Sequence, residues 1–178
     1  MFFKRVLIVF TVFIFAFSFV ACQKKEVSST DSNKFKVNPE PIIQDAMKKG
    51  KFLILIFESA DCKYCDLLNK EVLNDPEFQK HAEKNNVAIA VINVYGQREV
   101  TDPETGKKMS EEALTLAYRV QGYPTIVVFE PKDGKYTILY QIPGYIPKKD
   151  FMNFLEYLSS GCYKKIKYQE FVEKGKSC

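Results

Sequence analysis

The feature that most constrains this chain is a short apolar run that leads directly into a pair of cysteines. Residues 52–57 are all apolar, and Cys62 and Cys65 follow after a small polar loop. An apolar run of this length predicts a β-strand that is buried on both faces. The cysteines open a segment, 66–73, that we expect to be helical. Two thiols at a strand-to-helix turn indicate redox chemistry.

The size and composition of the chain are those of one folded domain. Its 178 residues suffice for one proper core but not comfortably for two. A hydrophobic content of 46% excludes a disordered protein. The net charge of +4 falls to +2 without residues 1–21, because 24 basic residues then face 22 acidic ones. So balanced a charge gives no reason to expect a nucleic-acid partner.

The first 21 residues have the composition of an export signal. Lys4 and Arg5 form a basic start, and residues 6–21 are apolar except for two hydroxyl side chains. This apolar stretch has 16 residues, whereas a membrane-spanning helix needs about 20. We therefore expect a signal peptide over residues 1–21.

Cys22 follows a Phe19-Val20-Ala21 sequence that is similar to the signal of bacterial lipoproteins, in which a small residue precedes a cysteine that becomes lipidated. The resemblance implies a lipidated Cys22 and a domain anchored on the periplasmic side of the bacterial envelope. Phe19 departs from the usual leucine, and its bulk also argues against ordinary cleavage. A retained anchor, plain secretion and an incidental Cys22 are the alternatives. The polar composition of residues 22–38 predicts a flexible tether.

Helices and strands are expected to alternate along the rest of the chain, with parallel pairing early and an antiparallel hairpin late. We expect further helices over 39–49, 76–82, 111–120 and 147–160. We expect further strands over 87–94, 125–129 and 136–142. The polar insertion 97–109 is expected to be an exposed loop or small hairpin. Residues 161–178 form a C-terminal extension with a short helix.

Two motifs, placed within this expected order of helices and strands, resemble those of a known family. Residues 62–65 form a Cys-Lys-Tyr-Cys motif after the first long strand, and residues 122–125 form Gly-Tyr-Pro-Thr at the start of a later strand. Together they resemble the thioredoxin superfamily over roughly 39–160. The resemblance implies an α/β thioredoxin fold: a mixed sheet of four to five strands between two layers of helices, in a domain over 39–178. It implies no cofactor.

Finer details are similar to exported thioredoxin-related proteins of the SoxW type. They include Glu58, the polar insertion, a Pro-Gly-Tyr at 143–145, and two later aromatic residues, Phe151 and Tyr157. The chain also departs from thioredoxin itself, since Asp61 stands where thioredoxin has tryptophan and Lys-Tyr replaces Gly-Pro between the cysteines. The position of the buried acid of thioredoxin is Ile56 here, which leaves Glu58 as the nearest acid.

The two cysteines have different expected roles. Only a thiolate attacks a disulfide. Cys62 lies at a helix N-terminus beside Lys63, and both favour the thiolate, so we expect Cys62 to attack and Cys65 to resolve the mixed disulfide. The alternatives are a structural disulfide or a metal-binding pair. Lys63 and Tyr64, between the cysteines, are expected to contact the substrate.

The second motif is expected to complete the site. By resemblance, Pro124 has a cis peptide bond after Tyr123, which leaves the Tyr123 backbone free to pair with an extended substrate; an ordinary strand proline is the alternative. Glu58 either accepts the proton of Cys65 through a water molecule or is an exposed strand-end carboxylate. Asp61 either raises the pKa of Cys62 or caps the loop.

The remaining ligand-type residues have simpler expectations. Cys162 and Cys178 are expected to form a structural disulfide worth about 3 kcal/mol. A second redox pair is an alternative, and so is a zinc site from four cysteines. His81 is expected on a solvated helix face.

The sequence thus predicts an exported thiol–disulfide oxidoreductase. The family favours the reducing direction, with protein disulfides as substrates and a membrane-embedded thiol as electron donor. A redox-inert binding or metal-carrier module and a disulfide oxidase or isomerase are the alternatives, because the sequence between the cysteines does not fix a reduction potential.

Overall fold

The computed structural model describes residues 34–178, so the expected signal peptide, Cys22 and most of the expected tether lie outside the described residues. The elements of the described part are α1 (Pro39–Lys49), β1 (Phe52–Glu58), α2 (Lys63–Leu68), a π-helical turn (Asn69–Leu73), α3 (Pro76–Lys84), β2 (Val87–Asn93), β3 (Glu99–Thr101), β4 (Lys108–Ser110), α4 (Glu111–Ala117), β5 (Thr125–Lys132), β6 (Lys135–Pro143), α5 (Lys148–Ser159), a 3₁₀ turn (Cys162–Lys164) and α6 (Tyr168–Glu173).

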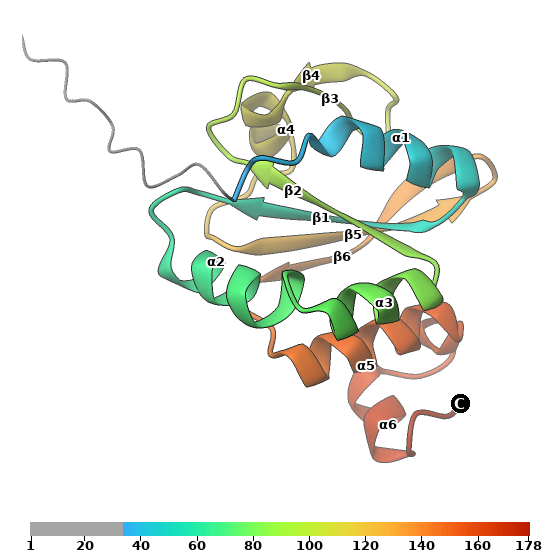
Figure 1. The fold of residues 1–178 in the computed structure, drawn as a ribbon. Helices are drawn as coiled ribbons and strands as arrows, with labels where there is room; N and C mark the ends of the chain where they lie inside the picture. The colour runs from blue at the N-terminus through green and yellow to red at the C-terminus, as the bar shows by residue number, and fades with distance from the viewer. Residues whose placement is uncertain (1–33) are drawn as a thin grey trace, which may run out of the picture.

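A mixed sheet forms the centre of residues 34–178, with its four strands in the order β2-β1-β5-β6. β1 pairs in parallel with β2, and the helices between them form the crossover that such pairing needs. β5 pairs antiparallel with both β1 and β6. Figure 1 shows helices on both faces: α1 and α4 on one, and α2, α3 and α5 on the other. This arrangement confirms the predicted three-layer fold.

The buried strand β1 supplies both cores. Successive side chains of a strand point to opposite faces. Ile54 and Ile56 belong to the core against α2, α3 and α5, whereas Leu55 and Phe57 belong to the core against α1 and α4. Glu58 shares the face of Ile54 and Ile56, so the strand directs its carboxyl group toward α2.

Local sequence signals set the helix boundaries. Asn38, Asp75 and Ser110 cap the starts of α1, α3 and α4, each accepting a hydrogen bond from a backbone N–H of the first turn. Pro76 occupies the first turn of α3, where a missing N–H costs nothing. Gly50 ends α1 with a φ of 61°, a left-handed conformation that favours glycine.

The polar insertion contains the β3–β4 hairpin, one of its two expected forms. The prediction that it is exposed is wrong for Val100, Thr101 and Asp102, which are buried. The reason is that the hairpin packs against α1, where the Glu40 carboxylate accepts hydrogen bonds from the Thr101 N–H (2.6 Å) and the Thr101 hydroxyl (2.7 Å).

An ion pair between the partly exposed Arg98 and a buried carboxylate joins this insertion to α4. Arg98 donates to both carboxylate oxygens of Glu111, at 2.8 and 2.9 Å. Glu111 is fully buried, and it also accepts a hydrogen bond from the Asn93 N–H at 3.0 Å. A Cβ atom at Gly96 would come within 2.1 Å of the Glu111 carboxylate, so only glycine fits there.

The C-terminal extension packs against α5. Phe171 of α6 is buried against the ring of Tyr157, with 5.2 Å between the ring centroids. The sulfur atoms of Cys162 and Cys178 lie 2.10 Å apart, at disulfide distance. The prediction of a solvated His81 is wrong, because the ring lies against α5 with its Nε2 atom 3.1 Å from the Met152 carbonyl.

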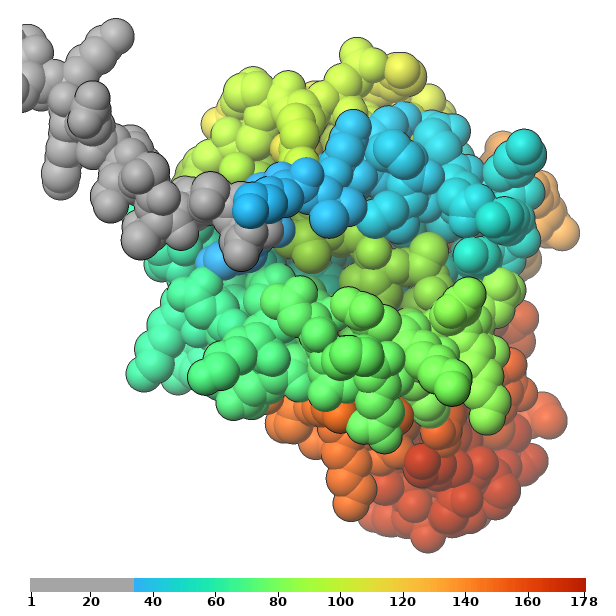
Figure 2. Space-filling model, in the orientation of Figure 1, coloured from blue at the N-terminus to red at the C-terminus, as the bar shows by residue number. Residues whose placement is uncertain are grey.

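An elongated groove lies beside the open edge of β2. Figure 2 shows this hollow between α1 on one side and α2 and α3 on the other. The strand contributes Val87, Ile89 and Val91, and the end nearest α2 is lined by Lys34 and Asp66. Within residues 34–178, no helix has both the length and the apolar character that a membrane span requires.

Candidate active site

Cys62 and Cys65 form a disulfide at the start of α2. Their sulfur atoms are 2.04 Å apart and their Cα atoms 5.2 Å apart. Cys62 lies at the rim with 8% of its surface exposed, whereas Cys65 has none. An incoming sulfur can therefore reach Cys62, while Cys65 is placed behind it.

The helix start gives Cys62 its environment. Cys62 is the N-cap of α2, with an extended backbone, and its Sγ atom accepts a hydrogen bond from the Cys65 N–H at 3.1 Å. Free N–H groups and the helix dipole at such a position stabilise negative charge. When the disulfide is reduced, the same N–H stabilises a thiolate on Cys62, which is the reactive form.

Glu58 lies beneath α2 and is fully buried, so the alternative of an exposed strand-end carboxylate is wrong. Asn69 donates through Nδ2 to the two carboxylate oxygens, at 2.9 and 2.7 Å. The same nitrogen lies 2.8 Å from the Cys65 carbonyl oxygen, to which it also donates. Asn69 therefore connects the carboxyl group of Glu58 to the backbone of the buried cysteine.

The buried position changes the acidity of Glu58. Burial raises the pKa of its carboxyl group from 4.5 to about 7. The hydrogen bond from Asn69 and the positive charge of Lys34 oppose this rise, and Asp66 adds to it. A carboxyl group with a pKa near neutrality can both accept and release a proton at physiological pH.

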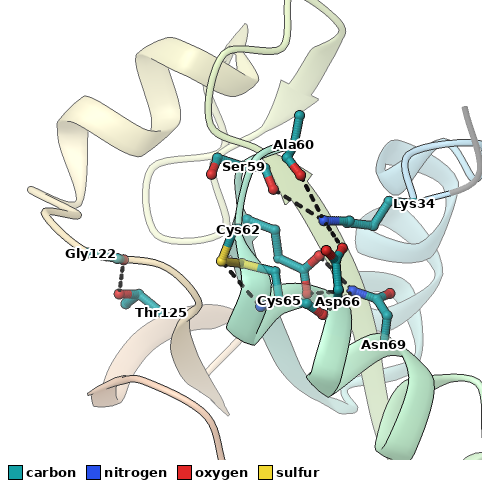
Figure 3. Close-up of a disulfide and its surroundings, with 10 residues drawn as sticks. Lys34, Ser59, Ala60, Cys62, Cys65, Asp66, Asn69, Gly122 and Thr125 are labelled. Carbon is teal, nitrogen blue, oxygen red and sulfur yellow. Dashed lines mark hydrogen bonds and ion pairs between the residues drawn. A yellow bond between two sulfur atoms is a disulfide. The ribbon is translucent and has the colours of Figure 1, made fainter. Parts of the chain in front are cut away.

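The segment before β5 lies at the same end of the sheet. The peptide bond between Tyr123 and Pro124 is cis. Thr125 pairs with Phe57 in the sheet, so Pro124 comes next to the end of β1 from which the cysteine loop departs. Figure 3 shows Gly122 and Thr125 across from the disulfide, where the Thr125 hydroxyl donates to the Gly122 carbonyl at 2.7 Å.

The other predicted site residues lie around the disulfide on the surface. Asp61, Lys63 and Tyr64 are exposed, and 59% of the Tyr64 surface is accessible. Tyr123 is half-buried. Burial is the larger cause that raises the pKa of its hydroxyl group, and a hydrogen bond with Tyr95 raises the pKa further. A contact of these side chains with a substrate stays a prediction.

Two residues of the site were missed by sequence reasoning. Asn69 follows Cys65 by four residues, so its place on the same helical face could have been inferred from spacing. Lys34 lies before α1 in the range expected to be a tether, and no local pattern marks it. Its ammonium group donates to the carbonyl oxygens of Ser59 (3.3 Å) and Ala60 (3.1 Å).

The second cysteine pair is not near this site in the fold. Cys162 follows α5 and Cys178 follows α6, whereas Cys62 begins α2. Within residues 34–178, no group of three His, Cys, Asp or Glu side chains is arranged to hold a metal ion.

Comparisons with known proteins agree with this architecture. A family model described as a thioredoxin-like domain matches residues 40–159. A thioredoxin-fold protein from Helicobacter pylori is 32% identical, with a TM-score of 0.55 over 71% of this chain and 80% of that one. A thioredoxin from Thermus thermophilus is 26% identical, with a TM-score of 0.54 over 70% of this chain and 88% of that one. Curated protein sequences give no significant match.

Proposed function

Because the chain belongs to the thioredoxin-like domain family, we propose that it is a thiol–disulfide oxidoreductase that exchanges electrons with disulfides of other proteins. The observation that carries the proposal is the pairing of an accessible Cys62 at a helix N-terminus with a buried Cys65 at disulfide distance. A cysteine pair with one open and one protected sulfur is suited to forming and then resolving a mixed disulfide.

The proposed reaction begins with the dithiol form. The Cys62 thiolate attacks one sulfur of a substrate disulfide, so a mixed disulfide forms and the other substrate sulfur leaves as a thiolate. Cys65 then loses its proton and attacks the Cys62 sulfur. This step forms the Cys62–Cys65 disulfide and releases the second substrate thiolate. The protein gives up two electrons, and the substrate disulfide becomes a dithiol.

Glu58 supplies the base for the resolving step. Its carboxylate receives the Cys65 proton, either directly or through a water molecule, when Cys65 attacks. The carboxyl group lies beside Cys65 through Asn69, and its pKa of about 7 lets it accept that proton near neutral pH. The Tyr123 backbone next to Pro124, with the exposed Lys63 and Tyr64, holds the substrate segment against Cys62.

The proposed cellular setting is outside the cytoplasm, and the N-terminal sequence supports it. A basic start, an apolar stretch and Cys22 favour export and lipid anchoring on the periplasmic side of a bacterial envelope. Substrates there are disulfides of exported proteins, and a membrane-embedded thiol donor returns the pair to its dithiol form. Incorporation of radiolabelled palmitate into the wild type, and its loss in Cys22→Ser, tests the anchor.

Reduction of insulin disulfides by dithiothreitol tests the activity. We expect the purified wild type to accelerate the reaction and Cys62→Ser to be inactive. We expect Cys65→Ser to accumulate a mixed disulfide that appears as a larger band on a non-reducing gel. If the wild type is no faster than Cys62→Ser, the protein is a redox-inert module and the proposal fails.

A redox titration against glutathione tests the direction. A midpoint near that of thioredoxin, about −270 mV, supports a reductase, whereas one near that of DsbA, about −120 mV, supports an oxidase. The reduction potential reports the relative stability of the dithiol and disulfide forms. It therefore separates a reductase from an oxidase even if both kinds of protein react with insulin.

A further inference from the structure

Lys34 reaches the active site from outside the region that the family model matches, 40–159. Its side chain is 11% exposed, which is unusual for lysine. All three donor positions of an ammonium group have partners here: the Ser59 and Ala60 carbonyl oxygens, at 3.3 and 3.1 Å, and the Asp66 carboxylate. Figure 3 shows this ammonium group between the cysteine loop and α2.

These partners lie on both sides of the cysteine pair. Ser59 and Ala60 belong to the loop that leads from β1 to Cys62, and Asp66 is the residue after Cys65. A single charged group therefore joins the end of the strand to the first turn of the helix. The contact fixes the spacing between the two segments that present the sulfur atoms.

The same ammonium group acts on the buried acid. Among residues 34–178, Lys34 and Asp66 are the charged groups whose fields act on the Glu58 carboxyl, and of these two Lys34 is the positive one. A positive charge favours the ionised carboxylate and lowers its pKa, whereas burial and Asp66 raise it. Without Lys34, the Asn69 hydrogen bond would be the one interaction left in the described part of the chain that lowers the pKa of Glu58.

The segment that carries Lys34 is itself held in place. Arg98 donates through Nη1 to the carbonyl oxygens of Phe35 (2.9 Å) and Val37 (2.8 Å). Arg98 is fixed in turn by its ion pair with the buried Glu111. The polar insertion thus anchors the backbone on both sides of residue 36, and the position of Lys34 does not depend on its side chain alone.

We propose that Lys34 is a positioning residue of the active site, which aligns the loop before Cys62 with α2 and keeps Glu58 ready to accept a proton. The inference rests on the proposed thiol–disulfide exchange, to which it adds a residue from outside the family domain. Lys34 acts through Glu58 and the loop and does not itself contact the reacting sulfur atoms.

The test compares four full-length proteins: wild type, Lys34→Met, Lys34→Arg and Lys36→Met. Methionine keeps most of the length of lysine and removes the charge, while arginine keeps the charge. Lys36 is the matched control, because it is exposed and its side chain has no hydrogen bond or ion pair among residues 34–178. The rate of insulin reduction is measured as a function of pH. The titration of the Glu58 carboxyl is followed by carbon NMR, with Glu58→Gln to assign the signal.

Loss of the positive charge should move the Glu58 midpoint upward by about one pH unit, the size expected for one nearby charge. The part of the pH profile of insulin reduction that depends on ionisation of Glu58 should move by the same amount. Below the midpoint, Lys34→Met should then be about tenfold slower than wild type. Lys34→Arg should restore the midpoint, and Lys36→Met should match the wild type. A role confined to holding the fold would lower the melting temperature of Lys34→Met without moving either midpoint.

The proposal is overturned if Lys34→Met titrates like the wild type, if Lys36→Met shifts equally, or if Lys34→Arg fails to restore the midpoint. These outcomes differ from failure of the proposed function, in which wild type and Cys62→Ser reduce insulin equally slowly. In that case the carboxyl titration still decides whether Lys34 acts on Glu58, because it needs no turnover.

Discussion

In the wild type, ionisation of the buried Glu58 carboxyl should destabilise the folded state as the pH rises. Replacing Glu58 with glutamine should remove this pH-dependent loss of stability. The folded protein holds the proton on Glu58 more tightly than the unfolded chain does, because burial raises the pKa from 4.5 to about 7. The stabilisation that comes from this proton is fully present below about pH 4.5 and is lost as the pH rises through about 7. Glutamine cannot ionise, so the variant does not lose stability in this range.

The difference between the two pKa values sets the magnitude. A gap of about 2.5 units, at 1.36 kcal/mol for each unit, corresponds to about 3 kcal/mol. We therefore expect the free energy of unfolding of Glu58→Gln, relative to wild type, to increase by about 3 kcal/mol between about pH 4.5 and pH 8.5. Other titrating groups are common to both proteins and cancel in this difference.

Urea denaturation at the two pH values measures this quantity. Both proteins are kept oxidised, so that Cys62 and Cys65 do not titrate. Glu83→Gln is the matched control, because Glu83 is an exposed glutamate of α3 without a side-chain hydrogen bond or ion pair in the described part of the chain. A wild-type to Glu58→Gln difference that is the same at both pH values would refute the argument that burial controls this carboxyl.

Two further predictions concern stability away from the cysteine pair. Replacing both Cys162 and Cys178 with serine should lower the free energy of unfolding by about 3 kcal/mol in urea, because the unfolded chain loses a covalent loop. Insulin reduction should be unchanged, and a loss of activity in a folded double variant would instead indicate a second redox pair. Arg98→Met should lower the free energy of unfolding by about 3–5 kcal/mol in the same assay, because it leaves the buried Glu111 carboxylate without its charged partner. Arg119→Met, at an exposed position, is its control, and an equal loss in both variants would contradict the reasoning.

The architecture could be predicted because its signals are local. The apolar run of β1 and the late hairpin each occupy a few consecutive residues. Such patterns determine the element order, and the order of strands and crossovers restricts the topology. The thioredoxin fold itself was predicted correctly from the resemblance of the motifs at residues 62–65 and 122–125 to that superfamily. The ends of the four central strands were predicted within a few residues of those in the structure.

The environment of the site was harder to predict because it depends on contacts between distant residues. Period-two alternation placed Glu58 on the same face as Ile56, but only the packing of α2 over that face shows that the carboxyl is buried. Lys34 contacts Ser59 and Ala60, which lie 25 and 26 residues away. No periodicity links such positions, and polar composition gave the opposite expectation of a free tether.

The burial of Glu111 could not be predicted for the same reason. Glu111 lies in the first turn of α4, where its negative charge is favourable to the helix dipole. In the structure it is fully buried, because Arg98 supplies a partner from the polar insertion. A charged side chain in a sequence predicts an exposed position. Its burial cannot be predicted until the fold shows which residue of opposite charge lies beside it.

The position of Lys34 also determines how this protein can be mounted on a surface or fused to a reporter. Lys34 lies beside the cysteine loop, so a domain joined directly to residue 34 would start next to the Cys62–Cys65 disulfide. Figure 1 shows the C-terminus beside α6, away from the start of α2. Immobilisation through the C-terminal end should leave Cys62 facing the solution, whereas a bulky domain joined directly to Lys34 should screen Cys62 from large molecules.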